Sequence, residues 1–231
     1  MPAPAPTPAS TQAPKRVLPV IVLAQLLGTS PWFAVNAVMP DLQAAFGWSA
    51  TAVGALTSAL QGGFIVGTLV FALLGYSDRF SARRLFLVCA VLAALCTLGA
   101  WISLPSLPLV WMWRALTGFF LAGIYPVGMK LAAMWFPHGL GSALGWLIGA
   151  LVLGSASPHA LRGLSAEGAS GAAGWTPVFV GVAGLTALAG LLLIALVPEP
   201  AKATGTAGST RTTQPAGALR RSEERRVGKE C

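Results

Sequence analysis

One arginine, Arg114, lies inside an apolar stretch, WMWRALTGFFLAG, where few other polar groups occur. A guanidinium at membrane depth is costly unless it meets water, a charged partner or hydrogen-bond acceptors. Two interpretations stay open. Arg114 binds a polar or anionic ligand, or it snorkels to the surface or bonds the carbonyls of a neighbouring helix. The chemistry expected of this side chain is recognition of a ligand, and no bond-breaking role is predicted.

Amide and hydroxyl side chains recur at helical spacing near Arg114. Gln25, Thr29 and Asn36 share one helical face, and Pro31 predicts a break or kink between them. Tyr125 follows Arg114 by eleven residues and falls on nearly the same helical face. Interhelical hydrogen bonds without ligand contact are the alternative role for such residues. The predicted cavity residues are Arg114, Gln25, Thr29, Asn36, Gln61 and Tyr125.

Residue types that enzymes and metal sites require do not gather in this sequence. Ser142, in the stretch GLGSALG, and His159 fall at opposite ends of one apolar segment, roughly 25 Å apart on a helix. His138 and His159 have no cluster of cysteines or carboxylates beside them, so no metal site and no cofactor are predicted. Cys89 and Cys96 are expected to be small apolar packing residues.

The elements that carry these residues are predicted from composition. Hydrophobic residues make up 55% of the chain, charged residues 10%, and the mean hydropathy is +0.72. The net charge is +8, but the basic residues lie between long apolar runs and form no continuous stripe. Nucleic acid is therefore not an expected partner. Barrel strands are shorter and alternate in polarity. We predict an all-α polytopic membrane protein, in contact with lipid, whose six transmembrane helices cover residues 17–39, 51–74, 85–102, 108–131, 142–161 and 177–197.

Basic residues predict the orientation of these six spans. Arg162 is the one basic residue expected on the outer side, and positive loops stay in the cytoplasm, so both termini are predicted to lie there, at a bacterial-type inner membrane. Asp41 is expected in an outer loop, and no carboxylate is expected inside a span, so proton coupling has no evident acid. The basic residues on the other side are Lys15, Arg16, Arg79, Arg83, Arg84, Lys130, Lys202 and Arg211.

The stretch GYSDRFSARRLF joins the second and third spans and concentrates charge. Its Gly75, Asp78, Arg79, Arg83 and Arg84 resemble the signature loop of the major facilitator superfamily, Gly-x-x-x-Asp-Arg-x-Gly-Arg-Arg, which lies between the same two helices. The stretch WRALTGFFLAGIYPVGMK resembles the fourth-helix motif of that family, which carries an intramembrane arginine. LLGTSPWFAVNAVMPDLQAAFGWS extends the resemblance over residues 17–198.

The resemblance implies a fold of twelve helices, arranged as two six-helix halves around a central cavity, with alternating access by rocking of the halves. This chain would supply the N-terminal half, with the missing C-terminal half as its partner. Transport of a small solute by the full-length permease is the implied function, and the fragment alone is expected to be inactive. Arg114, without a counter-charge, favours an anionic or polar organic substrate. A six-helix half-transporter that works as a homodimer, and a membrane enzyme or scaffold, are the alternatives.

Composition also predicts the character of the segments before and after the six spans. Residues 1–16 are Pro/Ala-rich and expected to be disordered. Residues 198–220 are predicted to be a flexible cytoplasmic linker. The ending RSEERRVGKEC, residues 221–231, matches the in-frame translation of a common sequencing-library adapter and is interpreted as an assembly artefact. In the fifth span, small residues are expected to allow close helix contact at Gly141, Gly145, Gly149 and Gly154.

Overall fold

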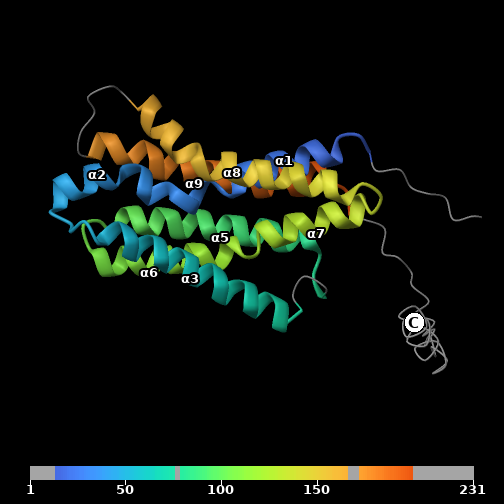
Figure 1. Ribbon diagram of the computed structural model, residues 1–231, viewed down its shortest axis with the longest axis horizontal. Coiled ribbons are helices and arrows are strands. Elements are labelled where there is room, and N and C mark those ends of the chain that lie inside the picture. Colours follow the sequence, from blue (N-terminus) through green and yellow to red (C-terminus); the bar gives the residue numbers. More distant parts are fainter. Residues whose placement is uncertain (1–13, 76–78, 166–171, 200–231) are drawn as a thin grey trace, which may run out of the picture. The chain divides into compact units, whose positions relative to one another are not determined.

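The computed structural model describes residues 14–75, 79–165 and 172–199 (Figure 1). Within these ranges the regular elements are helices. Asp78, and most of the predicted N-terminal segment, linker and adapter-derived end, lie outside the described residues. The helices are α1 (Val17–Gly28), the 3-10 helix η1 (Ser30–Phe33), α2 (Ala34–Phe46), α3 (Ala52–Leu73), α5 (Ala82–Ile102), α6 (Leu107–Leu121), α7 (Tyr125–Trp135), α8 (Leu140–Leu164) and α9 (Ala172–Leu196).

Six stretches of the described chain are long and apolar enough to cross a membrane as helices. This confirms the predicted all-α membrane fold and its six spans. The first span contains α1, η1 and α2, and the fourth contains α6 and α7; each of the other spans is one helix. The spans are Val17–Phe46, Ala52–Leu73, Ala82–Ile102, Leu107–Trp135, Leu140–Leu164 and Gly174–Leu196.

Pro31 interrupts the first span. α1 ends at Gly28, and Pro31 occupies one of the first positions of η1, after which α2 begins at Ala34. Proline has no backbone N–H and cannot continue the hydrogen-bond ladder of an α-helix, but it fits the first turn of a new helical segment. The break predicted at this proline is therefore confirmed.

α2 continues past residue 39, where the first span was predicted to end. Pro40 lies inside the helix, which ends at Phe46 because Gly47 adopts φ +66° and donates its N–H to the carbonyl of Gln43. Asp41 therefore lies in a helix of the first span. The prediction that no carboxylate lies inside a span is wrong, since Pro40, in the middle of α2, does not terminate this helix.

The six spans pack side by side (Figure 1). α3 packs mainly on α6, α5 packs on α6 and α9, and α1 packs on α8 and α9. Apolar side chains from several spans fill the interior. Fully buried examples are Ile21, Phe86, Leu121, Ile124, Leu131, Leu147 and Leu193 in one cluster, and Val38, Leu42, Leu56, Val110 and Phe179 in another.

Glycines bring the backbones of α3 and α6 into direct contact. A Cβ atom added at Gly118 would lie 1.9 Å from the carbonyl oxygen of Leu60, and one added at Gly63 would lie 1.9 Å from that of Ala115. No real Cβ tolerates such a distance. The two helices can approach this closely because each presents a glycine to the backbone of the other, as small residues commonly do between membrane helices.

The glycines of the fifth span differ in how closely other helices approach them. A Cβ added at Gly154 would lie 2.1 Å from the carbonyl oxygen of Leu26, so this glycine does allow α8 to contact α1 closely. Open space surrounds Gly141, Gly145 and Gly149 within the described part of the chain, so no described helix makes the predicted close contact with these three. Their face of α8 points away from the six-helix unit.

Candidate functional site

Arg114 lies in α6 and is buried inside the six-helix unit, with 2% of its surface exposed. Its Nη1 donates a hydrogen bond to the carbonyl oxygen of Pro31 at 2.8 Å, and its Nη2 donates one to that of Trp32 at 2.7 Å. Both acceptors belong to η1, where the first span is broken. The guanidinium fork therefore connects the fourth span to the break in the first span.

The planar shape of the guanidinium explains this contact. Arginine presents several N–H donors in a fixed fork, so one side chain can satisfy two neighbouring carbonyls. Within the described residues Arg114 has no carboxylate partner, and its Nε has no hydrogen-bond partner. The sequence left open whether Arg114 binds a ligand or bonds the carbonyls of a neighbouring helix. The structure contains the bonds to carbonyls. It leaves the positive charge without a counter-charge among the described side chains.

Gln25 and Thr29 lie next to this break, on α1 and at its end. Both are fully buried. The Thr29 hydroxyl donates to the carbonyl oxygen of Gln25 at 2.9 Å. The Gln25 amide packs against Gly128 of α7, where an added Cβ would lie 2.1 Å from Oε1, and neither amide atom has a hydrogen-bond partner among the described residues. An unsatisfied buried amide costs free energy, so burial of Gln25 lowers the stability of the fold.

The other three predicted residues lie on α2, α3 and α7. Asn36, partly buried on α2, donates from Nδ2 to the hydroxyl oxygen of Thr57 on α3 at 2.9 Å. Gln61 is exposed on α3. Tyr125 is partly buried at the first position of α7.

The predicted shared faces rely on unbroken helices, and the structure breaks both. η1 separates Thr29 from Asn36, and residues 122–124 separate α6, which carries Arg114, from α7, which begins at Tyr125. Spacing along one unbroken helix therefore does not describe either pair, and the assignment of the six residues to one cavity stays a prediction. Arg114 and the break beside Thr29 are brought together, and Gln61 is exposed on α3.

The described part of the signature loop connects the second, third and sixth spans. Gly75 has φ +59°, a conformation that favours glycine, and Arg79 and Arg84 are exposed. Arg83 is partly buried, donates a hydrogen bond to the carbonyl of Ile194 at the end of α9, and lies 3.7 Å from the carboxylate of Glu199.

An ion pair that the sequence analysis missed joins the first and fifth spans. Arg162 Nε lies 2.7 Å from Asp41 Oδ2, and Arg162 Nη2 lies 2.9 Å from Asp41 Oδ1, which is a bidentate arrangement. Both residues were assigned to the outer side of the membrane. The signal that could have paired them was this shared side together with the opposite charges of the two residues.

A second missed contact lies at the same break as Arg114. The hydroxyl oxygens of Ser30, in η1, and Thr186, in α9, are 3.2 Å apart, and both residues are fully buried. Ser30 also donates to the carbonyl oxygen of Leu27 at 2.7 Å. The break is thus held from two sides, by Arg114 of the fourth span and by Thr186 of the sixth. Within the described ranges, no group of three His, Cys, Asp or Glu side chains gathers that could hold a metal ion.

Comparison with known sequences decides the family. A sequence model described as the Major Facilitator Superfamily matches residues 21–226, which is more than half of the chain. The chain belongs to the major facilitator superfamily. No curated protein matches it.

Two solved structures of superfamily proteins share the fold. The proton:xylose symporter XylE, bound to 6-bromo-6-deoxy-D-glucose, aligns with a TM-score of 0.66 and 21% identity, over 80% of this chain and 44% of XylE. A bacterial homolog of the human lysosomal transporter Spinster, inward-facing and unoccupied, aligns with a TM-score of 0.67 and 18% identity, over 92% of this chain and 49% of that protein. This superfamily chain therefore spans less than half of each structure.

Membership of the superfamily makes this an integral membrane protein of a transporter fold. The family points to solute transport and away from enzymatic catalysis. In chemical terms, the arrangement around η1 offers one buried positive charge, three hydroxyl groups and one unsatisfied amide beside a broken membrane helix. Such a break exposes backbone groups to polar partners at membrane depth, as discontinuous helices do in transporters.

Proposed function

We propose that this chain is the N-terminal six-helix half of a permease that moves a small solute across a bacterial-type inner membrane by alternating access. The observation that carries the proposal is the superfamily match over residues 21–226 in a chain whose described residues hold six spans and which covers less than half of two solved relatives. A C-terminal half would be its principal partner. Both termini would lie in the cytoplasm, because basic residues concentrate at the loop around Arg84 and few lie on the other side.

The exposed faces of α3 and α8 support a facing half. Gln61 is exposed in the middle of α3, where hydrocarbon would leave its amide without partners. Gly141, Gly145 and Gly149 expose a row of small residues on α8 with open space before them. Small residues and amides are common where one membrane helix packs on another. Both helices therefore have surfaces suited to protein contact.

The break in the first span is the proposed centre of solute recognition. Arg114 holds η1 through the carbonyls of Pro31 and Trp32 and supplies positive charge there. Asn36 and Tyr125 are only partly buried, so their side chains can reach a solute between the halves. A site with a positive charge and neutral donors suits an anionic or polar organic solute. XylE binds a sugar derivative, which is one such polar class.

Transport by the full-length permease tests this function. The protein, reconstituted in proteoliposomes, should take up at least one member of a panel of labelled sugars and organic acids with saturation. Asn36→Ala should weaken uptake, since its amide lies in the proposed site, whereas Gln43→Ala on the same helix, near its outer end, should leave uptake close to wild type.

The chain without its facing half should show no saturable uptake, because alternating access needs two halves. Saturable, Asn36-dependent uptake by residues 1–231 alone, together with a discrete dimer in detergent, would instead support the homodimeric half-transporter. A full-length protein that is folded and inserted but moves no solute in the panel, while retaining another activity dependent on Ser142 or His159, would support the enzyme alternative.

A further inference from the structure

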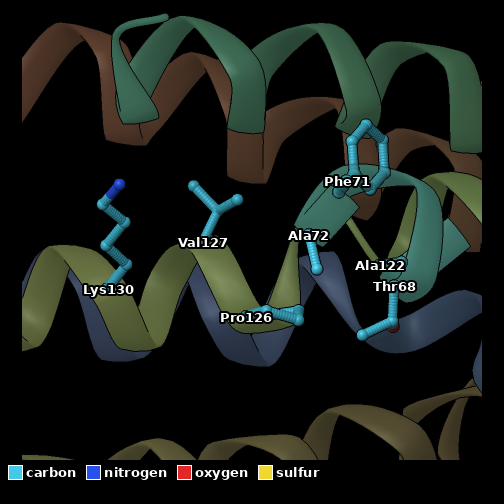
Figure 2. A pocket seen from close by; sticks show the side chains of 7 residues that line it. All are labelled: Thr68, Phe71, Ala72, Ala122, Pro126, Val127 and Lys130. Atoms are coloured by element: carbon cyan, nitrogen blue, oxygen red, sulfur yellow. The ribbon is translucent and has the colours of Figure 1, made fainter. Parts of the chain in front are cut away.

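The first and fourth spans are both broken near their middle, and the two breaks have different surroundings. In the fourth span, residues 122–124 separate α6 from α7, and a pocket of about 160 Å³ opens beside this junction toward α3 (Figure 2). In the first span, by contrast, Ser30 and Pro31 of η1 are buried. Backbone groups that a proline frees at membrane depth need partners from side chains or neighbouring helices. At η1 the structure supplies such partners.

Ser30 replaces a hydrogen bond that Pro31 removes. In an unbroken helix the carbonyl of Leu27 would accept the N–H of residue 31, four positions later, but proline has no N–H. The Ser30 hydroxyl lies 2.7 Å from the carbonyl oxygen of Leu27 and donates to it instead. This carbonyl therefore keeps a partner at the end of α1, and Ser30 is fixed against that helix.

Thr186, in α9, holds the Ser30 hydroxyl from the other side. The two hydroxyl oxygens are 3.2 Å apart, and Thr186 Oγ1 is also 2.8 Å from the carbonyl oxygen of Val182. Two hydroxyl protons cannot fill these contacts and the one to Leu27 at the same time. The carbonyl of Val182 lies inside α9, where the N–H of Thr186 is its helical partner. Donation from Thr186 to Ser30, and from Ser30 to Leu27, therefore satisfies the most groups.

The same short turn carries the carbonyls that meet Arg114. Pro31 and Trp32 follow Ser30 directly, and their carbonyl oxygens accept from Arg114 Nη1 at 2.8 Å and from Nη2 at 2.7 Å. A guanidinium fork binds two acceptors only when their positions match its own. Residues 30–33 form one 3-10 turn, so rotation of Ser30 would move both carbonyls. The position of the Arg114 charge therefore depends, through Ser30, on Thr186 of another span.

We propose that Ser30 and Thr186 are positioning residues for solute recognition at η1. This inference rests on the proposed function, which places an anionic or polar organic solute beside Arg114. Both residues are fully buried, so neither hydroxyl lies on a surface that a solute can reach. Their hydrogen bond connects the sixth span to the break in the first span, and it sets the direction in which Arg114 is held.

Uptake by the full-length permease in proteoliposomes, with the labelled sugar or organic acid of the panel that it transports, tests the positioning role. Thr186→Val keeps the shape of the side chain without its hydroxyl, and it should raise KM about fivefold while kcat stays within about twofold. Thr186→Ser keeps the hydroxyl and should restore KM. Thr97→Val is the matched control, because Thr97 is also buried and its hydroxyl bonds to the Ala93 carbonyl within α5. It should leave KM unchanged.

A second measurement needs no solute. Unfolding of this chain in detergent gives a double-mutant cycle between Thr186→Val and Arg114→Lys, whose side chains bond to η1 from two different spans. We expect the loss in the unfolding equilibrium constant of the double variant to fall short of the product of the single losses by about threefold, as between hydrogen-bonded side chains of membrane helices. Thr97→Val and Arg114→Lys should simply multiply.

An unchanged KM in Thr186→Val, an equal rise in Thr97→Val, or losses of Thr186→Val and Arg114→Lys that simply multiply would each overturn the positioning role. Ser30→Ala removes the other hydroxyl and should show the same shortfall with Arg114→Lys, so the cycle can be completed if Thr186→Val does not fold. A wild-type permease that takes up no solute of the panel would contradict the proposed function, and the cycle alone would then decide whether Thr186 positions Arg114.

Discussion

At the residue scale, Arg114 keeps its charge inside the six-helix unit because two carbonyls of η1 meet its guanidinium. Arg114→Lys keeps the charge but loses the fork, since one ammonium cannot replace two parallel donors. We expect the free energy of unfolding to fall by about 1–3 kcal/mol, the usual cost of an unsatisfied buried group. Thermal unfolding in detergent measures this. Arg84→Lys, exposed on α5, is the control and should change little; equal stability of both variants would contradict the assigned role.

The Asp41–Arg162 pair connects the first and fifth spans. Both side chains are partly exposed, with fractions of 19% for Asp41 and 27% for Arg162, so salt should screen the pair. We expect Asp41→Asn and Arg162→Gln each to lower the unfolding temperature, and the double variant to lower it by less than the sum. Strictly additive losses, or losses unchanged by high salt, would show that the pair does not act as an ion pair.

Residue types alone predicted that Arg114 needs a ligand, water or carbonyl acceptors, but not which of these it meets. The choice depends on η1, because only a broken first span directs two carbonyls toward the fourth. The same limit applied to Asp41 and Arg162. They are far apart in the sequence, and their pairing requires α2 to continue beyond Pro40 and α8 to extend to Leu164.

At the element scale, the contact between α3 and α6 depends on glycine. Gly118→Ala would place a Cβ 1.9 Å from the backbone of Leu60, so the helices must separate. We expect a loss of about 1–3 kcal/mol, typical of overpacking. Gly62→Ala on α3 faces open space and should be neutral or slightly stabilising, because alanine favours helices. Unfolding experiments on the two variants decide this, and a loss at Gly62 as large as at Gly118 would contradict the packing.

Hydrophobic run length predicted all six spans, since the length of a membrane helix follows from the thickness of the bilayer. It did not predict which glycines bring helices together. The regular spacing of Gly141, Gly145 and Gly149 suggested contact, yet Gly63 and Gly118 provide it. Spacing places residues on one face of a helix, but the neighbour of that face depends on the packing of the whole bundle.

At the scale of the whole molecule, the proposed orientation places the α2–α3 loop outside and the signature loop inside. In a variant whose Cys231 is replaced by serine, Ser49→Cys should react with a membrane-impermeant maleimide in intact cells. Arg84→Cys should react only after permeabilisation. Cys89 and Cys96 are buried and should contribute little background. The opposite labelling pattern would reverse the orientation and place the basic loops outside.

The central claim is that this superfamily chain is one half of a two-half permease. Long-read sequencing of the native locus, from the codons for Gly28 through the region past Ala218, tests it most directly. The account predicts that the reading frame continues into six further apolar spans and that RSEERRVGKEC is absent from the natural product. A stop codon soon after residue 220, with no second half encoded, would contradict the account and leave the homodimeric half-transporter as the leading explanation.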